Sequence, residues 1–262
     1  FLKKYFKAAS GGFLYKMLRK KNITLNKKKA DGSEILQAGD MIQVFFSDET
    51  FSKMRGQEAV SSEYQKLLQV PHELQVIYED DLMLIVNKPS GMLSQKASES
   101  DISLNESILS YLIHEGLLSE ETYAVFHPSV ANRLDRNTSG IVLAGKTLAG
   151  QQFLSDILRD RSAKKIYHCI VRGKVEEEMH LKGYLLKDER SNQVQIFSDE
   201  TQDAKPIETA YRPLVVGPDA TLLEVHLITG RSHQIRAHLA SIGHPIAGDP
   251  KYGDMVWNKK LR

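Results

Sequence analysis

The sequence predicts an α+β protein in which a small N-terminal α/β-type unit precedes a mixed, mostly antiparallel β-sheet domain flanked by helices. Strand patterns dominate after residue 73, and the few helical patterns among them do not alternate with the strands as they would in a parallel α/β sheet. Charge also divides the chain. The first thirty residues hold ten basic and no acidic side chains, whereas the other 232 hold 25 basic and 33 acidic ones. The formal net charge of +2 therefore combines a basic start with a mildly acidic body.

Residues 1–50 are predicted to form the small unit. Apolar residues at positions 13, 14, 17 and 18 have helical spacing, and short strand patterns follow at 23–25 and 41–46. A solvated surface would explain an isolated run of lysines, but ten cations without an anion favour binding to RNA or DNA phosphates. The polar side of the helix and the turn after the first strand carry the candidate RNA-binding side chains Lys16, Arg19, Lys20, Lys21, Lys27, Lys28 and Lys29.

Residues 51–73 are polar, lack a core pattern and are predicted to form a linker. The body of the protein then spans residues 74–262. Its strands are expected at 75–78, 82–87, 140–144, 165–171, 194–197, 208–216 and 221–228. Its helices are expected at 104–115, 149–159 and 232–242.

The apolar positions of these elements predict the core of the body. In the last strand, positions 221, 223, 225 and 227 share one side, as period-two alternation requires. Ser103 is expected to cap the first helix. Each helix is expected to turn one apolar face to the core. In chain order these faces are Ile108, Leu109, Leu112 and Ile113; Phe153, Leu154, Ile157 and Leu158; and Ile235, Leu239 and Ile242.

Composition excludes several classes of protein. The single cysteine, Cys169, excludes an internal disulfide framework and a cysteine-rich zinc site. No apolar run approaches the roughly 18 residues that a membrane span needs, and the apolar stretch near the N-terminus is too short for a signal peptide. We therefore expect a reducing, cytoplasmic setting. Because the chain begins at Phe1, we expect it to be part of a longer product.

Residues 140–147 match the nucleotide-binding pattern G-x-x-x-x-G-K-[ST]. That pattern works only as a loop whose successive N–H groups surround a phosphate. Here the four intervening residues are Ile, Val, Leu and Ala, which predict a buried strand. ATP hydrolysis is therefore the least favoured function.

Two polar segments carry the candidate chemistry. Asp135 lies between Arg133 and Arg136 in a polar stretch before a predicted strand, and a turn carboxylate that bonds local N–H groups is the simple alternative. Arg231 and Arg236 lie where a strand gives way to a helix, and a nearby arginine keeps a carboxylate ionised in a closed site. The histidines at 233, 238 and 244 lack the i,i+3 or i,i+4 spacing of helical metal ligands, so we expect no metal site.

With these segments in view, the chain closely resembles the RluA/RluC/RluD-type pseudouridine synthases. Residues 132–140 resemble the catalytic-aspartate motif H-R-L-D-x-x-T-S-G, and residues 164–167 with 171–173 resemble the motif that supplies a tyrosine. Residues 229–249 resemble the motif that supplies an arginine. Residues 78–81 and 87–91 resemble the strand pair that opens the catalytic domain. The motifs at residues 25–27 and 38–40, within the basic unit, resemble the S4 RNA-binding domain of many members.

This resemblance implies an isomerase with the pseudouridine synthase fold and an S4-like N-terminal domain. It implies that uracil is detached from C1′ of a uridine, rotated and rejoined through C5, with no metal, nicotinamide or nucleotide cofactor. Asp135 is the implied catalytic carboxylate and Arg231 its partner. Tyr167 is the residue implied to stack on uracil, and it is also a candidate base for removal of a proton. Arg133 is expected to fill the space that a flipped base leaves. The remaining expected substrate contacts are Ile235, which packs on the base, and the cations Lys88, Arg136 and Arg236 around the cleft.

The sequence departs from the family pattern in three respects. Residue 132 is Asn where the family usually has His, and residue 145 is Gly where a larger residue is commoner. The family's catalytic domain normally continues beyond the region that ends at residue 262, so its last strands are expected to be absent here. The first of these departures removes any role of that histidine from this chain.

The resemblance leaves the substrate less defined than the reaction. A basic S4-like unit before the catalytic domain favours large-subunit ribosomal RNA, with transfer RNA as the alternative of the same class. A non-catalytic RNA-binding or ribosome-assembly factor is the alternative of another class, but such a factor has no need of Asp135, Tyr167 and Arg231. We expect a monomer that binds RNA and no membrane.

Overall fold

The computed structural model describes residues 1–188 and 190–261. The chain forms two compact units, one up to Ser155 and one from Asp156 onwards, and the division falls within helix α7 (Leu148–Arg159). Both the helices and the antiparallel sheets confirm the predicted α+β class. The domain boundaries after residues 50 and 73 remain predictions, because the compact units divide elsewhere.

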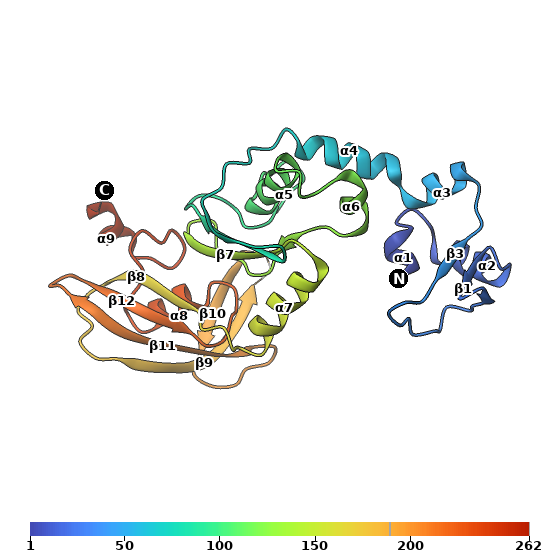
Figure 1. The fold of residues 1–262 in the computed structure, drawn as a ribbon. Helices are drawn as coiled ribbons and strands as arrows, with labels where there is room; N and C mark the ends of the chain where they lie inside the picture. Colours follow the sequence, from blue (N-terminus) through green and yellow to red (C-terminus); the bar gives the residue numbers. More distant parts are fainter. Residues whose placement is uncertain (189, 262) are drawn as a thin grey trace. The chain divides into compact units, whose positions relative to one another are not determined.

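The first unit opens with a small sheet in the order β2-β1-β3, formed by Lys28–Lys29, Ile23–Leu25 and Ile42–Val44. Figure 1 labels β1 and β3 of this sheet. Two helices precede it, α1 (Leu2–Tyr5) and α2 (Gly11–Arg19). The expected helix and both expected strands are present. A compact apolar core explains the arrangement, since the buried side chains of this part are Phe6, Leu14, Met17, Leu18, Ile23 and Ala30.

The segment that we expected to be a linker is mostly helical. It forms α3 (Asp48–Arg55) and α4 (Gln57–Leu67), and Val60 and Leu67 of α4 are buried. The Tyr64 hydroxyl donates a hydrogen bond of 2.9 Å to the backbone carbonyl of Leu118. A few well-spaced apolar residues are therefore enough to pack this polar helix onto the residues that follow it.

The second sheet of this unit has the strand order β4-β5-β7-β6, with every pair antiparallel. These strands are Val76–Glu79, Met83–Lys88, Gly140–Gly145 and Ser129–Val130. Helices α5 (Leu104–His114) and α6 (Glu120–Val125) accompany the sheet, and α5 contacts β6. The expected cap is confirmed as a capping box of Ser103 and Glu106, and all four expected inward residues of α5 are buried.

The segment that matches a nucleotide-binding pattern is strand β7, paired with β5 over its whole length. It therefore cannot form the phosphate-binding loop. Close packing explains why residue 145 is a glycine, because a Cβ at this position would lie 2.6 Å from the backbone N and Cα of Gln151 in α7. One expectation for α7 is wrong: Leu154 is buried, but Phe153 is 52% exposed rather than inward.

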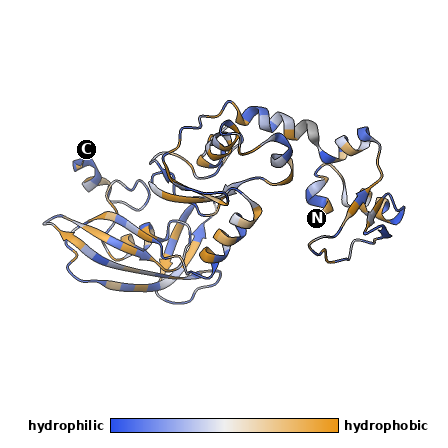
Figure 2. Cartoon of the chain, viewed as in Figure 1, coloured by the Kyte–Doolittle hydropathy of each residue, from blue (hydrophilic) through white to orange (hydrophobic). Residues whose placement is uncertain are grey.

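In the described part of the second unit, five strands form one antiparallel sheet in the order β10-β9-β11-β12-β8. Their bounds are Gln193–Phe197, Met179–Asp188, Lys205–Val216, Ala220–Leu227 and Ile166–Arg172. Alternate residues of β12 are buried, as predicted, and the banding of hydrophobic and hydrophilic residues along the strands is visible in Figure 2. Helix α8 (Gln234–Ser241) packs on one face of this sheet (Figure 1), and α9 (Met255–Lys260) follows.

Candidate active site

The loop at residues 131–139 connects β6 to β7 and carries Asp135. Buried Ser94 holds this loop by two bonds, since its Oγ donates to the Leu134 carbonyl at 2.8 Å and accepts from the Leu134 N–H at 2.9 Å. The Thr138 N–H closes a turn by donating to the Asp135 carbonyl at 3.0 Å. The backbone on both sides of the carboxylate is therefore fixed before any substrate binds.

Lys88 is placed differently from our expectation. The sequence predicts that Lys88 is a cation of the cleft that contacts the substrate, but its side chain is completely buried. It lies at the end of β5, on the same buried face as Leu84 and Val86. A side chain without exposed surface cannot contact an RNA phosphate, so Lys88 acts through hydrogen bonds inside the protein.

The Lys88 ammonium donates to three backbone carbonyls, those of Met92 at 2.7 Å, Pro89 at 3.0 Å and Arg136 at 3.1 Å. These bonds use every donor of the ammonium. Burial lowers the pKa of Lys88, and the charge of Asp135 opposes that shift. Lys88 therefore ties the segment after β5 to the residue next to Asp135 and places a positive charge near its carboxylate.

The arginines on either side of Asp135, Arg133 and Arg136, are both exposed, in agreement with side chains that can reach a ligand. Asn132, which stands where the family motif usually has a histidine, has a structural partner in β7. Its side chain donates to the Ile141 carbonyl at 3.2 Å and accepts from the Leu143 N–H at 2.8 Å. The asparagine thus holds the start of the Asp135 loop against the strand that follows it.

The other two expected catalytic residues belong to the second unit. Tyr167 lies in β8, opposite Val225 of β12, and packs partly buried against the main core of this unit. Arg231 is exposed in the turn between β12 and α8. Ile235, at the start of α8, packs partly buried against the same core as Tyr167.

Gln234 holds the turn that carries Arg231. The sequence does not predict this role, because Gln234 lies in a polar segment and nothing there indicates that its side chain is buried. Its buried side chain accepts from the Arg231 N–H at 3.1 Å and from the Thr229 hydroxyl at 2.8 Å. Its amide nitrogen donates to the Glu208 carbonyl at 3.0 Å and to the Thr209 hydroxyl at 2.9 Å. The turn is therefore fastened to β11, and the backbone of Arg231 has a defined place.

Arg236, which we expect to contact the substrate, also has a partner inside the second unit. Its guanidinium forms a two-bond pair with buried Asp249, at 2.6 and 2.9 Å, and lies over the Tyr252 ring. Burial alone would raise the pKa of Asp249, but the bonds from Arg236 and from the N–H groups of Tyr252 and Lys251 outweigh it, so the pKa is lowered. Arg236 thus holds the segment after α8 in place.

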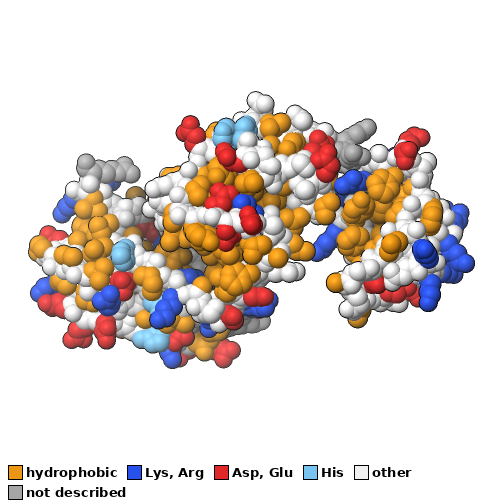
Figure 3. All heavy atoms as spheres, in the orientation of Figure 1, with side chains coloured by type: hydrophobic (Ala, Val, Ile, Leu, Met, Phe, Trp, Pro, Cys, Tyr) orange, Lys and Arg blue, Asp and Glu red, His pale blue; other side chains and the backbone are white. Residues whose placement is uncertain are grey.

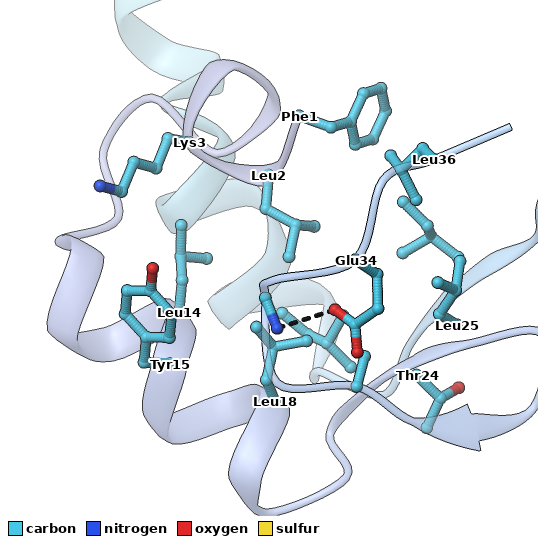
Figure 4. A pocket seen from close by; sticks show the side chains of 14 residues that line it. Phe1, Leu2, Lys3, Leu14, Tyr15, Leu18, Thr24, Leu25, Glu34 and Leu36 are labelled. Atoms are coloured by element: carbon cyan, nitrogen blue, oxygen red, sulfur yellow. Dashed lines mark hydrogen bonds between the residues drawn. The ribbon is translucent and has the colours of Figure 1, made fainter.

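The seven basic side chains expected to bind RNA in the N-terminal part are all exposed. Figure 3 shows Lys and Arg side chains gathered over the part of the chain that carries α2 and β1. A cavity of about 210 Å³ also lies in this part, and Figure 4 shows that its walls are largely apolar, with Leu14, Leu18 and Leu36 among them. The Glu34 carboxylate in its wall already has a partner within the protein, because it accepts a hydrogen bond of 2.8 Å from the Gly32 N–H.

Residues 1–188 and 190–261 contain neither a candidate metal site nor a candidate membrane span. In that part of the chain, no three His, Cys, Asp or Glu side chains are grouped so that they could hold a metal ion. No helix there is both long and apolar enough to cross a membrane. His238, one of the three histidines considered above, is buried beside the Thr209 hydroxyl, and burial lowers its pKa to about 4.

Comparison with known proteins agrees with this arrangement. Residues 82–241 match the family described as RNA pseudouridylate synthase. The ribosomal large subunit pseudouridine synthase C of Vibrio parahaemolyticus is 34% identical over 255 residues, covering 97% of this chain and 75% of that protein. The proteins of the same name from Haemophilus ducreyi and Escherichia coli K12 are 33% identical, covering all of this chain and 77% of theirs.

Two solved structures share the fold. The human RNA Pseudouridylate Synthase Domain Containing 1 superposes with a TM-score of 0.58 at 22% identity, over 73% of this chain and 74% of that one. The human RNA Pseudouridylate Synthase Domain Containing 4 gives a TM-score of 0.55 at 19% identity, over 76% of this chain and 74% of that one. The antiparallel sheets with packed helices are thus the fold of pseudouridine synthases.

The fold and the sequence matches together define the class: this chain belongs to the RNA pseudouridylate synthase family. It is an RNA pseudouridine synthase, an isomerase homologous to the bacterial synthases named above. The resemblance drawn from the motifs is confirmed. The family match begins at residue 82, so the S4-like nature of the N-terminal part remains a prediction.

Proposed function

We propose that this enzyme converts specific uridines of large-subunit ribosomal RNA to pseudouridine. One observation carries the choice of substrate: relatives bearing the name ribosomal large subunit pseudouridine synthase C align over 97% or more of this chain, its basic N-terminal part included. An alignment confined to the catalytic unit would favour no particular RNA.

We assign the catalytic carboxylate to Asp135. The reaction breaks the bond between C1′ and N1 of a uridine, forms a bond between C1′ and C5, releases the proton of C5 and adds a proton to N1. Asp135 acts either as a nucleophile at C1′ or C6 or by promoting elimination at the sugar. Each route needs an ionised carboxylate on a rigid backbone, and the bonds from Ser94 and Lys88 supply that backbone.

The remaining site residues have proposed roles around Asp135. Arg231 pairs with the carboxylate and keeps it charged, while Tyr167 stacks on the uracil and Ile235 packs on its other side. Arg133 fills the space left by the flipped base, since a planar guanidinium stacks on bases and contacts phosphates. Arg136 adds a phosphate contact. Lys88 and Arg236 are positioning residues, because their hydrogen bonds hold the backbone around the site.

The test of the substrate is tritium release from RNA labelled at C5 of uracil. We expect the full-length enzyme to release tritium from a large-subunit rRNA transcript and not from tRNA transcripts. Release from tRNA alone would replace rRNA by tRNA as the substrate. Tight binding to rRNA without release from either RNA would favour the non-catalytic assembly factor.

We further propose that residues 1–50 form an S4-like domain that holds RNA phosphates. Exchanging Lys27, Lys28 and Lys29 for Gln should lower the slope of log Kd against log salt concentration by about 2, because each lost phosphate contact lowers it by about 0.7 to 0.9. The control exchanges Lys259 and Lys260 for Gln, since both are also exposed and lie on α9. Equal slopes for both variants and the wild type would contradict the role of the basic unit.

A further inference from the structure

A second cavity, of about 310 Å³, lies within the second unit and opens beside Arg231. Its walls come from the end of β9, the start of β11 and the turn before α8. Three basic side chains, Lys187, Lys205 and Arg231, line it with a single acidic one, Asp203. The lining therefore carries a positive charge, which suits an anionic ligand.

The strand register places both lysines on the face of the sheet that α8 covers. Lys205 is paired with Leu185, and Lys187 lies two residues beyond Leu185 in β9. Opposite residues and residues two apart in a strand point to the same face. Leu185 packs against Ala237 of α8, which identifies that face.

The third cation reaches the same place from the turn before α8. Gln234 bonds the Arg231 N–H and, through its amide nitrogen, the Glu208 carbonyl of β11. Glu208 is three residues from Lys205 along that strand. The backbone that carries Arg231 is thus tied to the strand that carries Lys205, so the cavity is built from fixed elements.

The opposite face of the sheet differs, because its cations have carboxylate partners. Arg212 bonds Glu224 at 2.7 Å, and Lys182 lies 3.6 Å from Glu208. Within residues 1–188 and 190–261, no such ion pair is found for Lys205. Lys205 therefore differs from the paired cations of the opposite face, and it lines the cavity.

We propose that this cavity binds a phosphodiester group of the RNA strand adjacent to the target uridine. The proposal rests on the proposed function, because Arg231 would then lie between the reacting nucleotide and the strand that continues from it. Lysine and arginine side chains bind phosphate oxygens by charge-assisted hydrogen bonds. Leu185 and Leu186 provide apolar wall for the neighbouring sugar, and the Asp203 carboxylate can accept a hydrogen bond from a ribose 2′-hydroxyl.

The kinetic test uses Lys205→Gln and Lys187→Gln, with Lys182→Gln as the control on the other face of β9. For each cavity variant we expect KM for the RNA to rise about fivefold with kcat within about twofold of the wild type, because the contact is remote from the reacting bond. The salt slope of RNA binding should fall by about 0.7, the loss of one contact. Lys182→Gln should leave all three values unchanged.

A second measurement separates a phosphate contact from a structural effect of the lysines. One phosphate at a time near the modified uridine is replaced by an uncharged methylphosphonate. The wild type should lose affinity at one position, and Lys205→Gln should lose nothing further there. Losses that add at every position would overturn the proposal. A wild-type enzyme that releases no tritium would instead refute the proposed function, and an active one whose Lys205 and Lys187 variants match the Lys182 control would refute the cavity alone.

Discussion

Asp135→Asn is expected to lower kcat by at least about a thousandfold while leaving RNA affinity within about twofold. The exchange keeps the size of the side chain but removes the ionised oxygen that attacks the uridine or promotes elimination at its sugar. The backbone of the loop should be unaffected, because its bonds to Ser94 and Lys88 involve the backbone of residues 134 and 136 rather than the Asp135 side chain. Single-turnover tritium release and equilibrium RNA binding measure the two quantities.

Asp156→Asn is the matched control. Asp156 is an exposed carboxylate in α7 that pairs with Arg159 at 2.6 Å, and such surface pairs contribute little. Its exchange should leave kcat and affinity unchanged. An Asp135→Asn variant with wild-type kcat would remove the assignment, and one that has lost RNA affinity as well would show that the aspartate serves binding.

Lys88→Met is expected to destabilise the protein by about 2 to 4 kcal/mol and to lower kcat. The exchange removes the hydrogen-bond donor of three backbone carbonyls. Those of Pro89 and Met92 lie just after β5, and that of Arg136 lies in the loop that carries Asp135. The Arg136 carbonyl keeps one partner, the Gly91 N–H at 2.8 Å, so the loop should loosen rather than unfold. Urea unfolding measures stability, and tritium release under folded conditions measures kcat.

Lys96→Met provides the comparison for that variant. Lys96 lies eight residues after Lys88 and is exposed, so its exchange should change the free energy of unfolding by less than about 0.5 kcal/mol. If Lys88→Met were as stable and as active as Lys96→Met, the internal role given to Lys88 would be wrong. A stable variant with a lowered kcat would still support the positioning of Asp135.

Much of the fold could be predicted because burial leaves periodic patterns in the sequence. Its alternation predicts strand β12, and the apolar stripe with the serine before it predicts helix α5. The sequence does not predict strand β9, since its polar and charged outward residues and Gly183 give a weak pattern. A Cβ at Gly183 would lie 2.9 Å from the Phe197 carbonyl, so the glycine is a packing requirement that only the neighbouring strand reveals.

The site could be predicted less completely, because side-chain partners come from distant segments. We expect Lys88 to contact the substrate as a cation of the cleft, although period-two alternation along β5 places it on the buried face with Leu84 and Val86. The alternation is visible in the sequence. The carbonyl partners of Lys88 are not, since one of them, Arg136, is 48 residues away. Likewise, nothing local to Arg236 indicates a pair with Asp249 thirteen residues later.

The central claim is that Asp135 drives the isomerisation of uridine in RNA. The most direct test treats one C5-tritiated large-subunit rRNA transcript with the wild type and with Asp135→Asn, and compares tritium released with pseudouridine recovered after digestion to nucleosides. We expect one tritium released for each pseudouridine formed by the wild type, and neither from the variant. Tritium release without pseudouridine, or equal pseudouridine from both proteins, would contradict the account.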